Sequence, residues 1–420
     1  MKRGWVCALF VLFAAAIAAC GGGKSQVAVT EAIAVTGAAP SDAPSAEAIL
    51  DAAIEAAGGL AKIEAASSWV SRSQGVYMGV PYESKNTYKG GLVRMDIAMA
   101  GEPMSMVMAA EPCWMQTGPV VQSCTAEERR MNGAMSAMGE AMLLAPLKRP
   151  GWELTARKGE AGGRPADVLA VRNDAVGAAG ELYFDPESHR LVEARYKATM
   201  HGQEAEVVVA LSEYEELCGV RAFSRSVATF GGAPYVEEKI SEMACGPVDD
   251  AVFAAPAQVA DGTAVEKDVP AMTVTCDVMR GPYDGVGEAI GKVMGFMAER
   301  RLGPAGAPTL LYVVSPAETK DPAKYVTEVC FPVAAPPPAA PEESGDFVIK
   351  GLPATRVLAV YGVGPCDKKS GELAKRASDE AKKRKLVPAG HMRQISYSDP
   401  AMVPPDQQVS ELQLPVQRKK

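Results

Sequence analysis

The last third of the sequence contains the same pattern twice, in residues 269–333 and 352–416. The clearest matches are Gly281-Pro282 with Gly364-Pro365, and residues 327–333 (TEVCFPV) with 410–416 (SELQLPV). A period of roughly eighty residues that occurs only twice is too long for a solenoid, so it indicates a duplicated module that forms one pseudo-symmetric domain. A cleft between the two halves is then the natural place for a ligand.

Each copy has the pattern of a strand, a Gly-Pro turn, a helix and two further strands. The expected elements are 272–279, 284–301, 309–314 and 325–333 in the first copy, and 355–361, 368–386, 392–397 and 409–416 in the second. Residues 334–345 are rich in Pro and Ala, which predicts an exposed loop between the copies.

The N-terminus has the pattern of an export signal over residues 1–19. Lys2 and Arg3 precede an apolar run that is shorter than the ~20 residues needed to cross a bilayer. The small residues that end in Cys20, before three glycines, resemble a bacterial lipobox, which implies that Cys20 is lipidated. The alternative is an ordinary secretory signal. By the same resemblance, Gly21 favours a periplasmic location on the outer membrane of the cell envelope.

Charge and size exclude some functions and bound the domain count. Without the two charges of the signal, the net charge of −8 becomes −10, so a nucleic acid is not expected as a partner. A chain of 420 residues that is 48% hydrophobic can bury more than one core, and two domains are expected.

The cysteines of an exported protein lie in an oxidising compartment, where disulfides are permitted. Cys113 and Cys124 bracket a turn, and Cys218 and Cys245 flank a segment long enough for one hairpin, so both pairs are predicted to be disulfides. Whether Cys276 and Cys330 pair is left open, and Cys366 has no assigned partner. The sequence has no C-x-x-C motif, and we expect neither a metal nor a cofactor.

The N-terminal half begins with a polar segment, 20–45, that is expected to tether the protein to the membrane. A helix is predicted from Ala46, followed by many alternating strands up to about residue 253. A capping box at Thr125 predicts another helix, on which four methionines share one face: Met131, Met135, Met138 and Met142. These methionines either fill a core or line an apolar ligand site.

Residues 49–59 and 182–186 resemble the LolA/LolB-like proteins and the related outer-membrane lipoprotein-sorting proteins. The resemblance covers 46–256 and implies a half-open antiparallel β-barrel with helices. In that family the barrel encloses a hydrophobic cavity for acyl chains. Acyl chains or a lipoprotein are therefore candidate partners of this half.

After a predicted linker, 257–268, the duplicated part resembles the GyrI-like small-molecule-binding domains, also called AraC-type effector-binding or SOUL-related domains. The resemblance covers 269–417 and rests on Gly281-Pro282-Tyr283, Tyr312, Tyr397, Asp399-Pro400, Pro404 and the closing strands. It implies an α+β fold of two β-α-β-β modules whose cleft binds small amphipathic or cationic molecules. The implied binding residues are Glu328, Glu411, Tyr283, Tyr312, Tyr325 and Tyr397.

The two glutamates stand on otherwise apolar strands, where a carboxylate is costly to bury unless it is paired. A cationic ligand would pair it and tyrosines would supply π faces; alternatively, the glutamates point to solvent. The leading hypothesis is therefore a membrane-anchored, non-catalytic protein that binds a small amphipathic or cationic molecule. The alternatives are a lipid or lipoprotein carrier acting through the barrel, and a hydrolase using Glu411 with Tyr312 or Tyr397.

Overall fold

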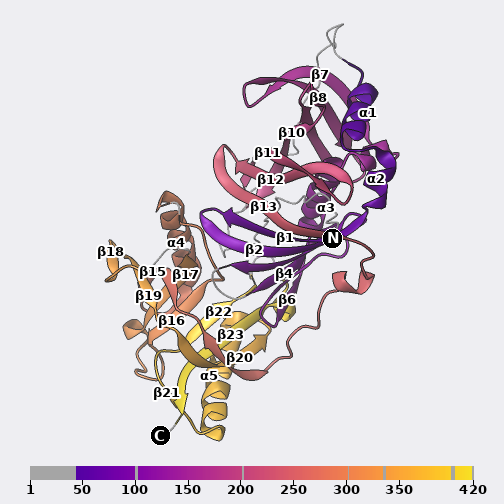
Figure 1. Ribbon diagram of the computed structural model, residues 1–420. Helices are drawn as coiled ribbons and strands as arrows, with labels where there is room; N and C mark the ends of the chain where they lie inside the picture. The colour runs from indigo at the N-terminus through magenta and orange to yellow at the C-terminus, as the bar shows by residue number, and fades with distance from the viewer. Residues whose placement is uncertain are drawn as a thin grey trace.

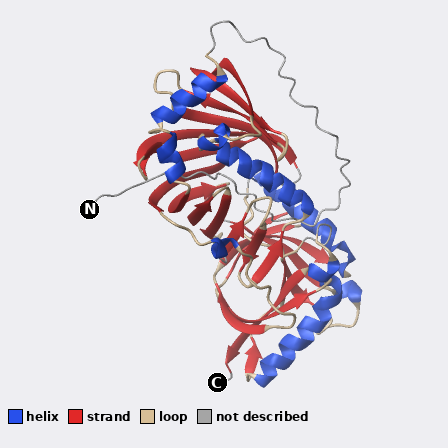
Figure 2. Cartoon of the chain, turned by 90° about the vertical axis from the view of Figure 1, so that its right-hand side faces the viewer, coloured by secondary structure: helices blue, strands red, loops and turns tan. Residues whose placement is uncertain are grey.

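The computed structural model describes residues 44–99, 103–200, 203–300, 302–333, 337–398 and 403–418. The predicted signal, Cys20 and all but the last two residues of the tether lie outside these ranges. Within the described part of the chain, no helix combines the length and hydrophobicity that a membrane span requires. The fold is α+β, with two antiparallel sheets and few helices. Figure 2 shows the two curved sheets one above the other.

The first sheet has thirteen strands, in the order β6-β5-β4-β3-β2-β1-β13-β12-β11-β10-β9-β8-β7. Their bounds are β1 Ser68–Tyr77, β2 Val80–Lys89, β3 Leu92–Met99, β4 Met104–Val107, β5 Trp114–Thr117, β6 Val120–Ser123, β7 Glu153–Ala161, β8 Arg164–Asn173, β9 Ala178–Phe184, β10 Leu191–Met200, β11 Gln203–Leu217, β12 Val220–Phe230 and β13 Ala233–Cys245. Every neighbouring pair is antiparallel, and β1 joins two meanders by pairing with β13. Strands β6 and β7 form the two edges, so the sheet is open (Figure 1).

Three helices and a short 3-10 turn accompany this sheet: α1 (Ala46–Ala56), α2 (Leu60–Ala65), α3 (Ala126–Ala141) and η1 (Ala145–Lys148). Helix α1 contacts β7 and β8, and α3 contacts β9 and β10. The predicted capping box is confirmed, because the Thr125 hydroxyl accepts from the Glu128 amide and the Glu128 carboxylate accepts from the Thr125 amide. Three of the four stripe methionines, Met135, Met138 and Met142, belong to the buried core.

The second sheet follows the order β14-β20-β23-β22-β16-β17-β15-β19-β18, and β21 pairs with β23 beside it. Its strands are β14 Ala264–Val269, β15 Met272–Arg280, β16 Thr309–Val314, β17 Val326–Val333, β18 Glu342–Ser344, β19 Phe347–Leu352, β20 Thr355–Val363, β21 Leu386–Pro388, β22 Arg393–Ser396 and β23 Val409–Arg418. Helix α4 (Val286–Arg300) packs on β15 and β17, and α5 (Cys366–Lys383) packs on β20 and β23. The short 3-10 turns are η2 Asp250–Phe253, η3 Tyr283–Gly285, η4 Pro322–Lys324 and η5 Pro405–Gln407.

Four strands of the second sheet, β14, β18, β19 and β21, were not expected from the sequence. Strand β14 occupies part of the predicted linker and pairs with β20, and β18 lies inside the predicted loop 334–345. Strand β19 pairs with β15 as β14 pairs with β20. The repeat therefore begins one strand earlier than its sequence match suggested, because β14 and β19 share too few residues to be matched by sequence.

Three disulfides tie the strands together. The predicted pairs Cys113–Cys124 and Cys218–Cys245 are confirmed, and Cys276–Cys330 joins directly opposite residues of β15 and β17. The Cys276 and Cys330 sulfurs and a Glu328 carboxylate oxygen lie within 4.8 Å of one another. Since the sulfurs are bonded to each other, they are not thiolate ligands for a metal.

The two sheets contact each other along β6. Val120 of β6 is buried in a cluster with Val269, Val357, Ala359, Tyr361 and Val409 of the second sheet. Gln122 donates hydrogen bonds to the Tyr397 carbonyl and, over 3.2 Å, to the Ser398 hydroxyl. Strands β4 and β6 accordingly lie beside β22 and β23 in Figure 1. The face of the second sheet opposite its helices is thus directed at the first sheet.

Candidate ligand-binding cavities

A cavity of about 640 Å³ lies between the two sheets. We call it the inter-sheet chamber. From the first sheet it is lined by Val80, Pro81, Ile97, Met99, Met104, Met115, Thr117 and Gln122. From the second sheet and its connections it is lined mainly by 269–273, 305–309, Pro332, Val333, Pro337, Leu352, Arg393, 395–397 and Gln413. Its size and mostly apolar lining are typical of a small-molecule site.

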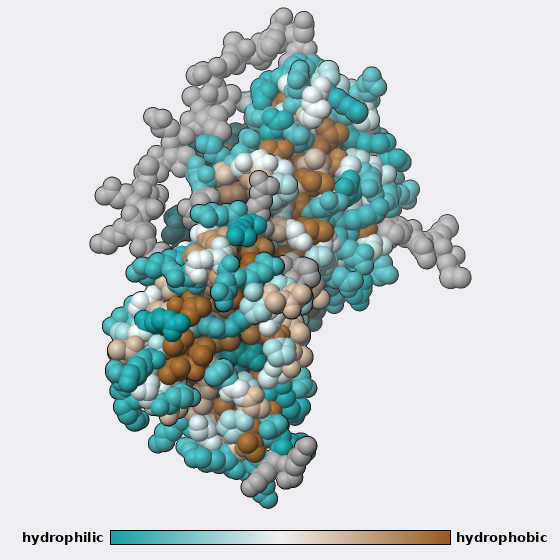
Figure 3. Space-filling view, turned by 90° about the vertical axis from the view of Figure 1, so that its left-hand side faces the viewer, coloured by the Kyte–Doolittle hydropathy of each residue, from teal (hydrophilic) through white to brown (hydrophobic). Residues whose placement is uncertain are grey.

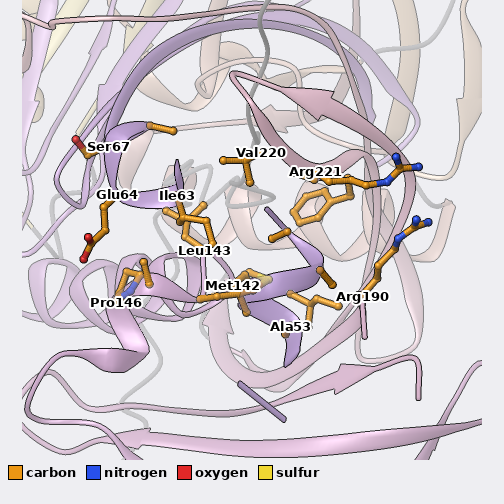
Figure 4. A pocket seen from close by; sticks show the side chains of 18 of the residues that line it. Ala53, Ile63, Glu64, Ser67, Met142, Leu143, Pro146, Arg190, Val220 and Arg221 are labelled. Atoms are coloured by element: carbon orange, nitrogen blue, oxygen red, sulfur yellow. The ribbon is translucent and has the colours of Figure 1, made fainter. Parts of the chain in front are cut away.

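A smaller cavity of about 340 Å³ lies under the helices of the first sheet. We call it the helix-side cavity. Figure 4 shows Ala53, Ile63, Met142, Leu143 and Val220 around it, from α1, α2, the end of α3 and β12. Arg190 and Arg221 extend together along one side, and the Arg190 guanidinium lies 5.2 Å from the centre of the Tyr214 ring. Apolar surface, brown in Figure 3, runs through both halves of the face shown there.

Glu411 is fully buried on β23 and all of its hydrogen-bonding capacity is used inside the protein. The Lys267 ammonium of β14 lies 3.0 Å from Oε1 and 3.1 Å from Oε2. The Tyr397 hydroxyl donates to Oε2 over 2.7 Å, and the Gln413 amide donates to Oε1 over 2.8 Å. Glu411 therefore has an internal counter-charge and does not need a cationic ligand.

Glu328 has the equivalent arrangement in the first copy. Its carboxylate pairs with the Lys350 ammonium of β19, and its side chain is 14% exposed. Lys267 and Lys350 each stand two residues before the Val-Pro or Leu-Pro that opens the matched segments. Neither lysine was predicted from the sequence, because the matched segments begin only at residues 269 and 352. The two pairs remove the physical reason for expecting a cationic ligand, and neither glutamate points freely to solvent.

The four predicted tyrosines do not form one site. Tyr283 lies edge-on to Tyr312, with ring centres 5.6 Å apart, and stacks on Tyr325 at 5.3 Å. Tyr312 packs against the core under α5, so this cluster is on the helix side of the second sheet. Burial raises the pKa of the Tyr283 hydroxyl, and nearby Tyr325 and Glu318 act in the same direction. Only Tyr397 lines the inter-sheet chamber, where its hydroxyl reaches Glu411.

Arg393 is a third charged residue that was not predicted from the sequence. It opens β22, is only 6% exposed and lines the chamber. Burial lowers the pKa of its guanidinium, and the charge of Glu411 opposes this effect. Arg393 is the one charged residue among the described residues that line the chamber. The position equivalent to Arg393 in the first copy is Thr309, so the two copies of the repeat do not share this charge.

A buried acid in the first sheet has a structural explanation. Glu238 of β13 accepts a hydrogen bond of 2.6 Å from the Tyr82 hydroxyl of β2 and one of 3.5 Å from the Asn86 amide. Burial raises the pKa of its carboxyl group, and these hydrogen bonds oppose the change. Glu238 does not line either cavity. It links β13 to β2 across the intervening strand β1.

The model of the GyrI-like small molecule binding domain family matches residues 223–334. The chain contains a GyrI-like domain. The match includes β15, α4, β16 and β17, which carry Glu328 and one wall of the chamber, and it extends back into β12 of the first sheet. Because it covers well under half of the sequence, it identifies a GyrI-like domain and not a family for the whole chain.

No curated protein matches the chain. Solved structures resemble parts of it at low identity. The chain matched in the EcmrR–DNA complex is 14% identical with a TM-score of 0.33. The match covers 37% of this chain and only 58% of the length of that chain. A hydrolase from Listeria innocua is 16% identical with a TM-score of 0.29, over 40% of this chain and 96% of its own. A LolA superfamily protein from Nitrosomonas europaea is 12% identical with a TM-score of 0.36, over 50% of this chain and 98% of its own.

Proposed function

We propose that the protein is an exported, non-catalytic binding protein that holds a small amphipathic molecule in the inter-sheet chamber. The single observation that carries this proposal is the chamber itself, which both sheets line with mostly apolar side chains and a few polar groups. Sites of about 300–1,000 Å³ with this lining are typical of small-molecule ligands. The GyrI-like match supports the same class of function.

In this proposal the first sheet is a half-open barrel, and the second is a two-module GyrI-like domain whose open cleft it covers. The series β15-α4-β16-β17 and β20-α5-β22-β23, which meet at the β16–β22 pair, support two modules. Met99, Met104 and Met115 lie in the part of the chamber wall that comes from the first sheet. Their flexible side chains can adapt to varied apolar ligands.

The absence of catalysis is also a proposal, and it rests on the state of Glu411. A general base must reach its substrate, but this carboxylate is fully buried and holds Lys267 and Tyr397. The hydrolase hypothesis would require both contacts to be broken before a substrate could reach the carboxylate. Ligand binding without turnover requires no break in the contacts of Glu411 with Lys267 and Tyr397.

A second candidate function is lipid or lipoprotein carriage through the helix-side cavity. It is favoured by that cavity's apolar wall and by the arginines at its side, Arg190 and Arg221, which suit an acyl chain with a negatively charged head. The two functions differ in which cavity the ligand occupies. One experiment therefore separates them.

We expect Ala307→Trp to weaken binding of an apolar probe such as N-phenyl-1-naphthylamine by at least roughly tenfold, because the indole would occupy part of the chamber and obstruct the probe. Ala56→Trp is the matched control, since Ala56 is also a half-buried alanine but lines the helix-side cavity. Fluorescence titration measures both. Loss of binding in Ala56→Trp alone would instead place the ligand in the helix-side cavity and favour the carrier function, and unchanged binding in both variants would refute the two cavities as sites.

We further propose that a lipid on Cys20 holds the protein at the outer membrane. This proposal is based on the residues that resemble a lipobox. Cys20→Ser is then expected to move the protein from the membrane fraction to the soluble periplasmic fraction or to leave it as uncleaved precursor. Fractionation and immunoblotting measure this. A variant that is processed and retained like the wild type would contradict the lipid anchor.

A further inference from the structure

The Arg393 guanidinium is a buried cation that no carboxylate of the described residues contacts directly. Among the residues that the structure describes, none forms a hydrogen bond or an ion pair with it. A buried charge is stabilised only when it is paired and hydrogen-bonded, so an unpaired one costs free energy. An arginine remains protonated at any physiological pH, and it therefore cannot lower this cost by losing its proton.

Glu411 does not serve as the partner of Arg393. Its side chain is on the same face of the sheet, because Arg393 stands opposite Gln413 and Ile395 stands opposite Glu411 in the β22–β23 pairing. However, each of its oxygens already accepts hydrogen bonds from Lys267 and from either Tyr397 or Gln413. The anion that would pair with Arg393 must come from the chamber that this residue lines.

A second buried polar group beside Arg393 also lacks a partner. Gln413 is 2% exposed and lines the chamber, and its Oε1 accepts no hydrogen bond within the described structure. Its amide nitrogen is held by Glu411, which fixes the side chain. An acceptor without a partner among the described residues therefore stands next to Arg393 at the wall of the chamber.

The rest of the chamber suits an apolar tail. The first-sheet wall includes Ile97, Met99, Met104 and Met115. Flexible methionines suit apolar groups of varied shape, and the remaining polar lining residues are uncharged. A polar end and an apolar end are thus present in one cavity.

We propose that the inter-sheet chamber binds an amphipathic anion, whose carboxylate or phosphate head pairs with Arg393 and whose apolar tail lies against the methionines of β3, β4 and β5. This inference rests on the proposed function and names the ligand class. Arg is well suited to both head groups because its planar fork of N–H donors matches two oxygens of either.

The test is isothermal titration of the whole chain with four dodecyl amphipaths below their micelle concentrations: dodecanoate, dodecyl phosphate, dodecanol and dodecyltrimethylammonium. The two anions are expected to bind roughly ten- to a hundredfold more tightly than the alcohol, the range of a charge-assisted hydrogen bond. In Arg393→Gln this preference should vanish while the affinity for dodecanol stays the same. The relative affinities of dodecanoate and dodecyl phosphate distinguish the two anion sources.

Arg72→Gln is the control, because Arg72 is an arginine that lines neither cavity. It should leave all four affinities unchanged. Without ligand, Arg393→Gln should melt at a higher temperature than the wild type, because an unpaired buried charge is removed. Should that variant fail to fold, Arg393→Lys, which keeps the charge without the fork, should retain a weaker preference for anions.

Tighter binding of the ammonium, or an anion preference that survives in Arg393→Gln, would overturn the inference. Equal binding of all four compounds, lost in Ala307→Trp, would leave the proposed function standing and refute only the anionic ligand class. If none of the four binds, or if Ala56→Trp alone removes binding, the proposed function fails together with the inference.

Discussion

Replacing Glu411 by Gln is expected to lower the free energy of unfolding by about 3–5 kcal/mol, the usual cost of removing one partner from a buried ion pair. The substitution leaves the Lys267 ammonium, whose side chain is only 20% exposed, without its carboxylate. It also removes the charge that accepts from Tyr397. Urea unfolding followed by circular dichroism measures the change.

Two variants control for this result. Glu328→Gln should cost less, because its carboxylate and Lys350 are 14% and 21% exposed and water can partly solvate the lysine that remains. The double variant Lys267→Met with Glu411→Met should recover most of the lost stability, since it removes both charges together. A loss below about 1 kcal/mol in Glu411→Gln would show that the pair is not structural and would revive the hypothesis that this carboxylate awaits a cationic ligand.

The repeat predicted the order of elements in the second sheet because it contains two strong local signals, a Gly-Pro turn and a closing Pro-Val strand. It could not predict β14 and β19, whose sequences, AVEKDV and FVIKGL, share little beyond the lysine. That lysine was the sequence signal from which the two ion pairs could have been predicted. A lysine at the same position of both copies, each matched to a glutamate at the same position, predicts two equivalent ion pairs once the repeat is extended by one strand.

The tyrosines show why a list of residues on strands does not define a site. Successive residues of a strand point to opposite faces, so a shift of one position moves a side chain to the other side of the sheet. Tyr312 and Tyr397 are not at equivalent positions of the repeat, because the position equivalent to Tyr312 is Ser396, one residue before Tyr397. Tyr312 consequently packs under α5, whereas Tyr397 lines the chamber.

The chamber and Arg393 could not be derived from the sequence of the second half alone. The first-sheet wall of the chamber comes from β2 to β6, which stand well over a hundred residues earlier in the chain than the lining residues of the second sheet. Arg393 would be an ordinary exposed residue on an open sheet. The packing of the first sheet over this face is what buries it and turns it into a candidate binding group.

Removing the Cys276–Cys330 disulfide, by changing both residues to Ala, is expected to lower the free energy of unfolding by about 4 kcal/mol. A disulfide mainly restricts the unfolded chain, and this one spans 54 residues. It also lies in the centre of the second sheet, between β15 and β17, where both cysteines are fully buried. Thermal and urea unfolding measure the loss.

The matched control is the removal of Cys113–Cys124, which spans only 11 residues and should cost about 3 kcal/mol. Amide hydrogen exchange separates the two effects, because the loss of protection should centre on β15 and β17 in the first case and on β5 and β6 in the second. Equal losses of protection in both sheets would mean that the sheets unfold as one unit. A cost of Cys113–Cys124 removal that exceeds that of Cys276–Cys330 would contradict the argument from loop length, and local packing would then determine what each disulfide contributes.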